Sequence, residues 1–195
     1  MSKKPQASSV SPEYVILGFL RQQPAHGYEL HERITQQLET IWTISPSQIY
    51  SILNRLEARN LISGVTQEQE RAPTRRSYYL TPLGQRHLDA WLREPTQPSS
   101  HAIRVEFLTR LYFTYTTDPD QALHLIDSQI VDTQAASERF QALFTDTPQS
   151  QIFKRMGLEL RVQQLTSIVA WLRHCRTQLQ DLAAGTSDQP CNENP

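Results

Sequence analysis

One stretch of the chain, residues 45–60, carries hydrogen-bonding side chains at helical spacing. It reads Ser-Pro-Ser-Gln-Ile-Tyr-Ser-Ile-Leu-Asn-Arg-Leu-Glu-Ala-Arg-Asn. Hydroxyl, amide and guanidinium groups of this kind can bond base edges or phosphate oxygens. From this segment we expect six side chains to contact DNA: Ser47, Gln48, Tyr50, Ser51, Asn54 and Arg55.

The types of side chain suggest distinct contacts. The amides of Gln48 and Asn54 can bond adenine, and Arg55 can bond guanine or hold a phosphate. The Tyr50 hydroxyl can reach a phosphate, although its ring could instead pack against the domain. Glu57 is expected to turn away from DNA or to pair with a neighbouring arginine.

A second basic feature follows, in a segment expected to be the tip of a β-hairpin. Residues 61–65 and 77–80 have the composition of strands, and the charged run between them contains a proline. It places Arg71, Arg75 and Arg76 within six residues. Exposed hairpins are often charged, but beside a polar helix these arginines favour contact with phosphates or the minor groove.

The helix that presents the polar face has clear end signals. Ser45, Pro46 and Gln48 form a capping box with proline at the first helical position, and Asn60 suits a left-handed cap. The opposite stripe is apolar and is expected to face a core; it consists of Ile49, Ile52, Leu53 and Leu56.

Composition changes divide the chain into two expected domains. Residues 95–100, rich in proline and serine, read as a linker. The expected parts are a disordered N-terminus (1–10), a DNA-binding domain (11–94), the linker (95–100), a helical domain (101–183) and a disordered tail (184–195). In the helical domain we expect one helix over 101–115, a second capped by Asp118-Pro119, and a third opened by Thr147-Pro148.

The last helix carries a heptad-like apolar stripe, which suits packing at a shallow angle. It consists of Leu158, Val162, Leu165, Val169, Leu172 and Leu179 and is interrupted by Arg176. Spacing alone favours equally a dimer interface and an intramolecular core.

These motifs, in this order, resemble the PadR family of transcriptional regulators. The matching segments are His26–Leu30, Ser45-Pro46, Ile49-Tyr50, Arg55–Glu57, Leu61-Ile62, Pro73–Arg76, Tyr78, Leu80-Thr81 and Gly84, with Glu106–Leu108 and Val169–Leu172 beyond the linker. Asn60 and Ala72 stand where the family more often has glycine. The resemblance implies a mainly α protein with a small β-hairpin, a winged helix-turn-helix domain followed by an α-helical dimerisation domain.

The resemblance also implies a function. Members are usually homodimeric repressors that bind operator DNA as an inverted repeat and are often released by a small-molecule effector. The resemblance favours the interpretation of the apolar stripe as a dimer interface. Aromatic residues could line an effector pocket, but aromatics at this spacing are more often core; they are Tyr14, Trp91, Tyr112, Tyr115 and Trp171.

Bulk properties narrow the alternatives. The formal net charge is −1, while the first 94 residues carry 11 basic against 9 acidic side chains. The two cysteines have no metal or disulfide spacing, and no glycine-rich phosphate loop, nucleophile elbow or histidine pair indicates an enzyme. We expect no cofactor, no metal and no membrane segment in a cytoplasmic protein. The main alternative is a winged-helix adaptor that binds protein instead of DNA.

Overall fold

The computed structural model describes residues 11–69 and 72–186, with side chains for 11–66 and 76–182. The chain divides into two compact units, Met1–Glu94 and Pro95–Pro195.

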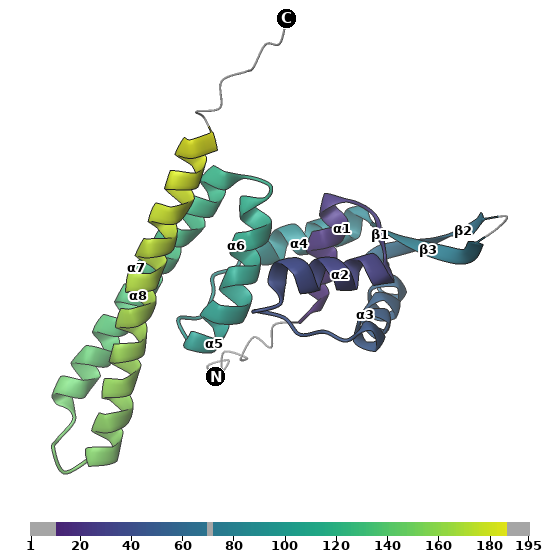
Figure 1. The fold of residues 1–195 in the computed structure, drawn as a ribbon. Coiled ribbons are helices and arrows are strands. Elements are labelled where there is room, and N and C mark those ends of the chain that lie inside the picture. Colours follow the sequence, from purple (N-terminus) through teal and green to yellow (C-terminus); the bar gives the residue numbers. More distant parts are fainter. Residues whose placement is uncertain (1–10, 70–71, 187–195) are drawn as a thin grey trace, which may run out of the picture. The chain divides into compact units, whose positions relative to one another are not determined.

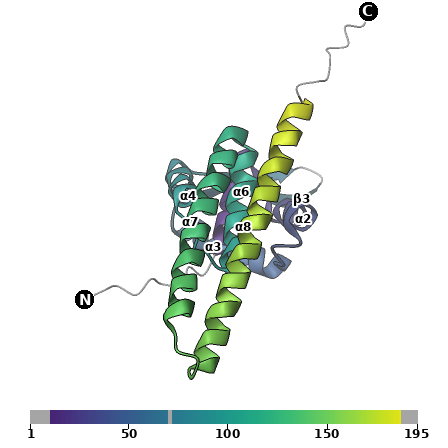
Figure 2. The same ribbon diagram turned by 90° about the vertical axis from the view of Figure 1, so that its left-hand side faces the viewer.

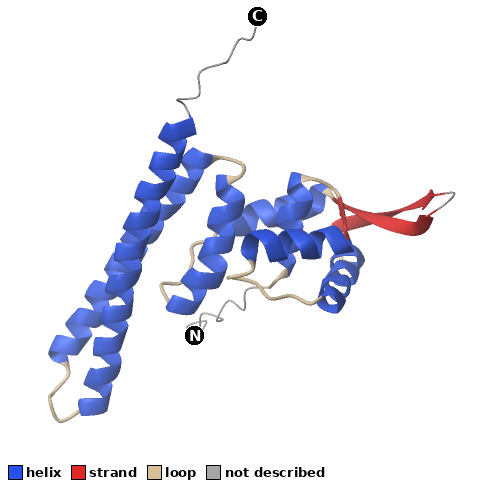
Figure 3. Ribbon diagram, in the orientation of Figure 1, coloured by secondary structure: helices blue, strands red, loops and turns tan. Residues whose placement is uncertain are grey.

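Over residues 11–69 and 72–94, the first unit is built from four helices and a small antiparallel sheet (Figure 1). Its elements are α1 (Glu13–Gln22), β1 (Ala25–His26), α2 (Gly27–Leu38), α3 (Pro46–Ala58), β2 (Ile62–Gln69), β3 (Ala72–Leu80) and α4 (Pro82–Arg93). The strand order is β1-β3-β2. In Figure 3 the hairpin of β2 and β3 projects from this group of helices.

The sheet differs from the sequence expectation in two respects. Strands β2 and β3 extend further towards the tip than the predicted runs, with an irregularity between Gln67 and Gln69. Strand β1 was not predicted: Ala25 pairs with Tyr78, and His26 with Ser77. Two residues are too few to show a strand pattern in a sequence.

The core of the first unit joins α1, α2, α3 and α4. Its least exposed side chains include Ile16, Leu17, Phe19, Leu30, Ile34, Ile49, Leu53, Leu56, Ile62 and Leu88. Gly84 permits the close approach of α4 to the end of α3, because a methyl group there would clash with the carbonyl of Leu61. The Thr81 hydroxyl caps α4 by accepting from the Gly84 amide at 3.0 Å.

The second unit is entirely helical over the residues that the structure describes. Its elements are α5 (Ser100–Ala102), the π-helical turn η1 (Ile103–Phe107), α6 (Leu108–Tyr115), α7 (Pro119–Asp146) and α8 (Ile152–Thr186). Figures 1 and 2 show α7 and α8 side by side as a long antiparallel hairpin. The expected helix over 101–115 is therefore present, with a π-helical turn that periodicity did not indicate.

The expected start of the last helix at Thr147-Pro148 is wrong. Thr147 instead ends α7: its hydroxyl donates to the carbonyl of Leu143 at 2.6 Å. Arg155 then donates to the carbonyls of Phe144 and Thr147 at 3.0 and 2.6 Å. Proline disfavours a helical conformation in the residue before it, so the same Thr-Pro pair suits the end of a helix as well as a start.

A buried polar cluster fixes the beginning of the second unit. Arg110 is fully buried and its guanidinium lies 2.6 Å from the carboxylate of Glu106. Arg110 also donates to the hydroxyl of Thr96 at 2.6 Å, and the Gln129 amide donates to the carbonyl of Thr96 at 3.2 Å. The segment expected to be a linker is thus partly built into the helical unit. The predicted fold class, mainly α with a small hairpin, is confirmed.

Candidate nucleic-acid interface

Both ends of α3 are fixed by the residues that the sequence indicated. The Gln48 amide donates to the Ser45 hydroxyl at 3.3 Å, and the Gln48 side-chain oxygen accepts from the Ser45 amide at 2.8 Å, which completes the capping box. At the other end Asn60 has a φ of 57°. The amides of Asn60 and Leu61 close a Schellman motif on the carbonyls of Glu57 and Leu56 at 2.8 and 2.9 Å.

Helix α3 has a buried face and an exposed polar face. Ile49, Ile52, Leu53 and Leu56 are buried. The six residues predicted to contact DNA from this helix are all exposed, namely Ser47, Gln48, Tyr50, Ser51, Asn54 and Arg55. Because the buried stripe fixes the rotation of α3, these polar groups are held towards solvent.

The capping role limits what Gln48 can offer to a base. Its side-chain oxygen accepts from the amide and, at 3.0 Å, from the hydroxyl of Ser45. Recognition of adenine by an amide uses both the oxygen and the nitrogen. With the cap intact, Gln48 presents chiefly its amide nitrogen, whereas Asn54 has no such engagement among the contacts of the described residues.

Arg55 is anchored to the start of α1. Its guanidinium lies 3.3 Å from the carboxylate of Glu13, and it also donates to Ser51 at 3.3 Å. Arg59 binds the second oxygen of Glu13 at 2.7 Å. One carboxylate therefore holds two arginines, so their combined charge is only partly neutralised.

At the base of the hairpin, Glu57 connects α3 with both strands. One oxygen of Glu57 accepts from the amide of Gly64 at 2.9 Å and from Arg76 at 2.7 Å. Arg76 crosses Gly64 so closely that a methyl group there would clash with it, and its guanidinium lies 5.6 Å from the ring centroid of Tyr78. Burial raises the pKa of Tyr78, with a partial opposing effect from Arg76. The expectation that Glu57 pairs with a neighbouring arginine agrees with this geometry.

A cavity beside α3 contains an aromatic residue that the sequence did not single out. It has a volume of about 580 Å³ and its lining includes Tyr28, Tyr50, Arg76 and Tyr78. Tyr28 is 71% exposed and Tyr50 is 49% exposed. The ring of Tyr50 rests against Gly27, where a methyl group would clash. Leu30, Ile34 and Leu38 form the buried stripe of α2, and Tyr28 lies off that stripe. This position in the sequence was the available signal that Tyr28 is exposed.

The side chains of two of the predicted hairpin arginines lie outside the described part of the chain. Arg71 is outside the described residues. Arg75 belongs to β3, and the structure describes its backbone but not its side chain. Arg76 is the predicted hairpin arginine whose side chain is described, and 47% of that side chain is exposed.

The apolar stripe of α8 lies largely inside its own unit. Leu165 and Leu172 are fully buried and Val169 is 7% exposed. Val169 and Leu172 share a core with residues of α7, such as Ile126 and Ile130. The remaining stripe residues, Leu158, Val162 and Leu179, are partly exposed. Leu165, Val169 and Leu172 are thus covered by other residues of the same chain, and the dimer interface stays a prediction.

Arg176, which interrupts this stripe, is held by α7. Its guanidinium binds both oxygens of Asp127 at 2.6 and 3.2 Å, and this hydrogen-bonded partner raises the pKa of Arg176.

The described residues were also compared with the requirements of a metal site and of a membrane span. No cluster of three potential metal ligands occurs among the side chains described. Within residues 11–69 and 72–186, none of the helices combines the length and apolar character needed to cross a bilayer. Of the aromatics considered for a pocket, Tyr14 and Trp91 stack on each other at 4.4 Å between ring centroids.

Comparison with known proteins decides the family. Residues 16–90 match the transcriptional regulator PadR-like family, and residues 103–180 match the family described as virulence activator alpha C-term. The negative transcriptional regulator PadR of Bacillus subtilis is 30% identical over 123 residues, which are 63% of this chain and 67% of that protein. The chain belongs to the PadR family.

Members of this family are transcriptional regulators, and so is this chain. This role is a non-enzymatic one, as the sequence indicated. A probable transcriptional regulator of Mycobacterium tuberculosis, Rv1176c, is 31% identical over 86 residues. These residues make up 44% of this chain and 46% of that protein, so the chain spans less than half of it. The crystal structure of Bacillus subtilis PadR in complex with operator DNA gives a TM-score of 0.43 at 24% identity, covering 86% of this chain and 98% of that one.

Proposed function

We propose that this PadR-family protein is a sequence-specific DNA-binding repressor. The observation that carries the proposal is the exposed polar face of α3, whose opposite side is buried and whose two ends are capped. A helix held in this way can enter the major groove without losing its own packing.

The contacts divide into base-reading and phosphate-binding groups. Asn54 is the best placed to bond adenine because its amide is exposed and uncommitted among the described contacts. Arg55 bonds guanine or a phosphate. The remaining groups, proposed to bind phosphates or to assist, are Ser47, Gln48, Tyr50, Ser51, Arg71, Arg75 and Arg76.

Regulation by this protein is proposed to require two copies. One α3 offers few base contacts, whereas two, about 34 Å or a multiple apart, would recognise an inverted repeat. Repression is favoured because the Bacillus subtilis relative is named a negative regulator. As parts of the same proposal, and following the family pattern, a small-molecule effector releases the protein from its operator, and the protein is located in the cytoplasm.

The test is DNA binding over a salt series, after selection of a preferred duplex from a random pool. Asn54→Ala should reduce discrimination between sequences by about 1–3 kcal/mol. Arg76→Ala should weaken binding to all sequences and lower the log–log salt slope by about 0.9 for each phosphate that the protein no longer neutralises.

Thr166→Ala, on the exposed surface of α8, serves as the control and should leave both properties unchanged. Failure of the wild-type protein to retain any duplex at low salt would overturn the proposal and leave the adaptor alternative.

A further inference from the structure

The cavity beside α3 lies within the first unit and has three tyrosine side chains in its lining. They come from different elements: Tyr28 from α2, Tyr50 from α3 and Tyr78 from β3. Tyr28 and Tyr50 are largely exposed, whereas Tyr78 is buried. The tyrosines give the cavity aromatic walls, two of which a ligand can reach from solvent.

The elements around this cavity are held together by close contacts. A methyl group at Gly27, the first residue of α2, would lie 2.7 Å from the ring of Tyr50 in α3. The His26 ring lies 3.3 Å from the hydroxyl of Ser77, across the pairing of β1 with β3. The cavity is therefore a feature of the packed domain and does not depend on the position of one surface side chain.

The charges that line the cavity are unequal. Two carboxylates, Glu29 and Glu32, face one guanidinium, that of Arg76. Arg76 already has an acidic partner, because its guanidinium lies 2.7 Å from Glu57. Among the described residues, Glu29 accepts from the amide of His26 at 2.9 Å and Glu32 from the side chain of Gln36 at 3.1 Å, and neither forms an ion pair. The lining thus carries an excess of negative charge.

The structure of α2 explains only one of these carboxylates. Glu29 is the acidic residue of a capping box, a position where such residues are common. Glu32 lies one turn further on and takes no part in the cap. Its charge beside the aromatic walls is what a binding site would require.

Aromatic rings beside uncompensated carboxylates suit the binding of an organic cation. The face of an aromatic ring attracts a cation within about 6 Å of its centroid, and quaternary ammonium groups are recognised in this way. A carboxylate adds attraction of the opposite charge. An anion would be repelled by both glutamates, and a neutral ligand would gain nothing from them.

We propose that this cavity binds a small organic cation of the quaternary ammonium class, and that the cation competes with DNA. The competition rests on the proposed function, because Tyr50 and Arg76 line the cavity and are also proposed to bind phosphates. A ligand between these two side chains holds them away from the DNA backbone. The first unit then carries both the DNA-binding surface and a site that controls it.

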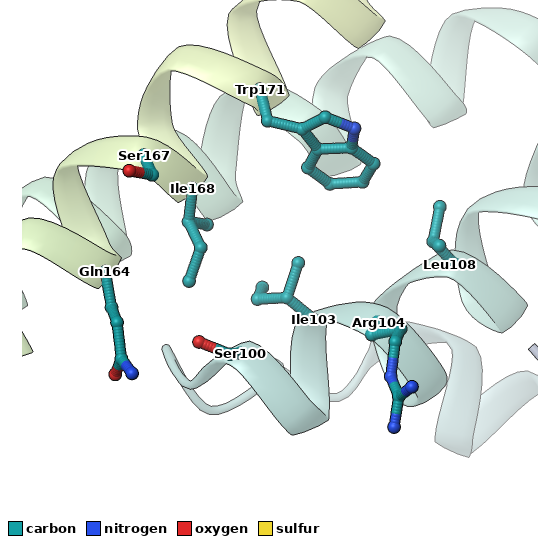
Figure 4. A pocket seen from close by; sticks show the side chains of 8 residues that line it. All are labelled: Ser100, Ile103, Arg104, Leu108, Gln164, Ser167, Ile168 and Trp171. Atoms are coloured by element: carbon teal, nitrogen blue, oxygen red, sulfur yellow. The ribbon is translucent and has the colours of Figure 1, made fainter.

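A cavity of the second unit provides a contrast. It has a volume of about 470 Å³. Figure 4 shows the Trp171 indole, Ile168, Ile103 and Leu108 around this space, with the Arg104 guanidinium turned outward. The described residues that line it include no carboxylate. This cavity suits a neutral or anionic ligand, so the charge of a probe distinguishes the two cavities.

The first test compares three probes of similar shape and different charge by NMR titration of the full-length protein without DNA. They are choline, the neutral 3,3-dimethyl-1-butanol and the anionic 3,3-dimethylbutanoate. Choline should bind on the order of 10-fold more tightly than the alcohol, and the anion should bind most weakly. Absence of saturable choline binding, or an equal affinity for the alcohol or the anion, would overturn the inference.

The second test removes one aromatic wall. Tyr28→Leu should weaken choline binding about 5-fold or more, because the ring face is lost. Tyr28→Phe keeps the ring and should bind choline within about twofold of the wild-type affinity. Both variants should keep their helical circular dichroism, since Tyr28 is 71% exposed. A Tyr28→Leu variant that binds choline as well as the wild type would refute the site.

The third test concerns charge. Glu32→Gln should weaken the binding of choline and leave that of the alcohol unchanged. Glu39→Gln, an exposed position of the same helix end that does not line the cavity, is the matched control and should bind choline normally. Ser167→Arg, at the edge of the second cavity, should also bind it normally. Loss of choline binding in Ser167→Arg but not in Glu32→Gln would place the cation in the second unit and overturn the inference.

Competition with DNA separates this inference from the proposed function. Choline should raise the apparent Kd of the wild-type protein for its preferred duplex more than sodium chloride of equal ionic strength does. Tyr28→Leu, which is not proposed to contact DNA, should bind the duplex normally and lose this difference. Choline binding without displacement of DNA would refute the competition. If the protein binds choline as expected but no duplex, the proposed function fails and the cation site stands.

Discussion

Glu57 shows how a single acidic residue can shape the surface that is proposed to bind DNA. Its carboxylate joins α3 to the hairpin through Gly64 and Arg76. It also places a negative charge beside Arg76, which is proposed to bind a phosphate. The structural and electrostatic effects of Glu57 on DNA binding should therefore oppose each other.

Glu57→Gln should separate these effects. The amide oxygen can still accept from Gly64, while the charge that partly neutralises Arg76 is removed. We expect DNA affinity to rise about 2–5-fold for all sequences, from a surface charge interaction of up to about 1 kcal/mol. Fluorescence anisotropy with specific and random duplexes would measure it.

Glu159→Gln, at an exposed position of α8, is the control for the loss of one negative charge. If both variants gain DNA affinity equally, the effect of Glu57 comes from the net charge of the protein and does not depend on Arg76.

At the scale of elements, Gln48 has a structural role in α3, as part of its cap, and a proposed role in DNA recognition. The side chain caps the helix that it is proposed to help dock. Mutation to alanine would remove both roles together and would not distinguish them.

Gln48→Glu should distinguish them. A carboxylate is the usual partner in a capping box and is favourable at a helix N-terminus, so the free energy of unfolding should change by less than about 0.5 kcal/mol. DNA affinity should fall on the order of 10-fold through repulsion of phosphates. Urea denaturation and a binding titration would check the two results, and a loss of stability with unchanged affinity would contradict the recognition role.

Elements with local signals were predictable from the sequence. The caps of α3 depend on Ser45, Gln48 and Asn60 alone, and its rotation depends on the spacing of four apolar residues. The exposure of the predicted α3 side chains followed from that rotation.

Elements that depend on distant partners were not predictable. Strand β1 exists because β3 pairs with it, and the π-helical turn contains Glu106, whose carboxylate is paired with the buried Arg110. The stripe of α8 could not be assigned to one partner, because the same spacing suits an intramolecular and an intermolecular neighbour. Tyr28 was missed, although its place off the buried stripe of α2 indicated that its side chain is exposed.

At the scale of the whole molecule, the division into two units predicts independent responses to damage. Arg110→Met removes one member of a fully buried ion pair and leaves Glu106 without its counter-ion. The second unit should lose about 3–5 kcal/mol of stability, while the first should be unaffected. Scanning calorimetry should show the shift in one of two transitions.

Arg176→Met is a matched control in the same unit, because its pair with Asp127 is exposed to solvent and should matter little. Replacing both Arg110→Met and Glu106→Leu should restore much of the loss. A shift of both transitions together would show that the units unfold cooperatively.

The anchoring of Thr96 leaves a very short connection between the units. Helix α4 ends at Arg93, and from Thr96 onward the chain is bonded to Arg110, Gln129 and, through the carbonyl of Pro98, Arg161. Glu94 closes α4, because its amide donates to the carbonyl of Trp91 at 3.1 Å. The next residue is Pro95, whose ring fixes its own φ torsion. A residue inserted or deleted between Arg93 and Thr96 would therefore act on a segment whose two ends are already fixed, each within its own unit.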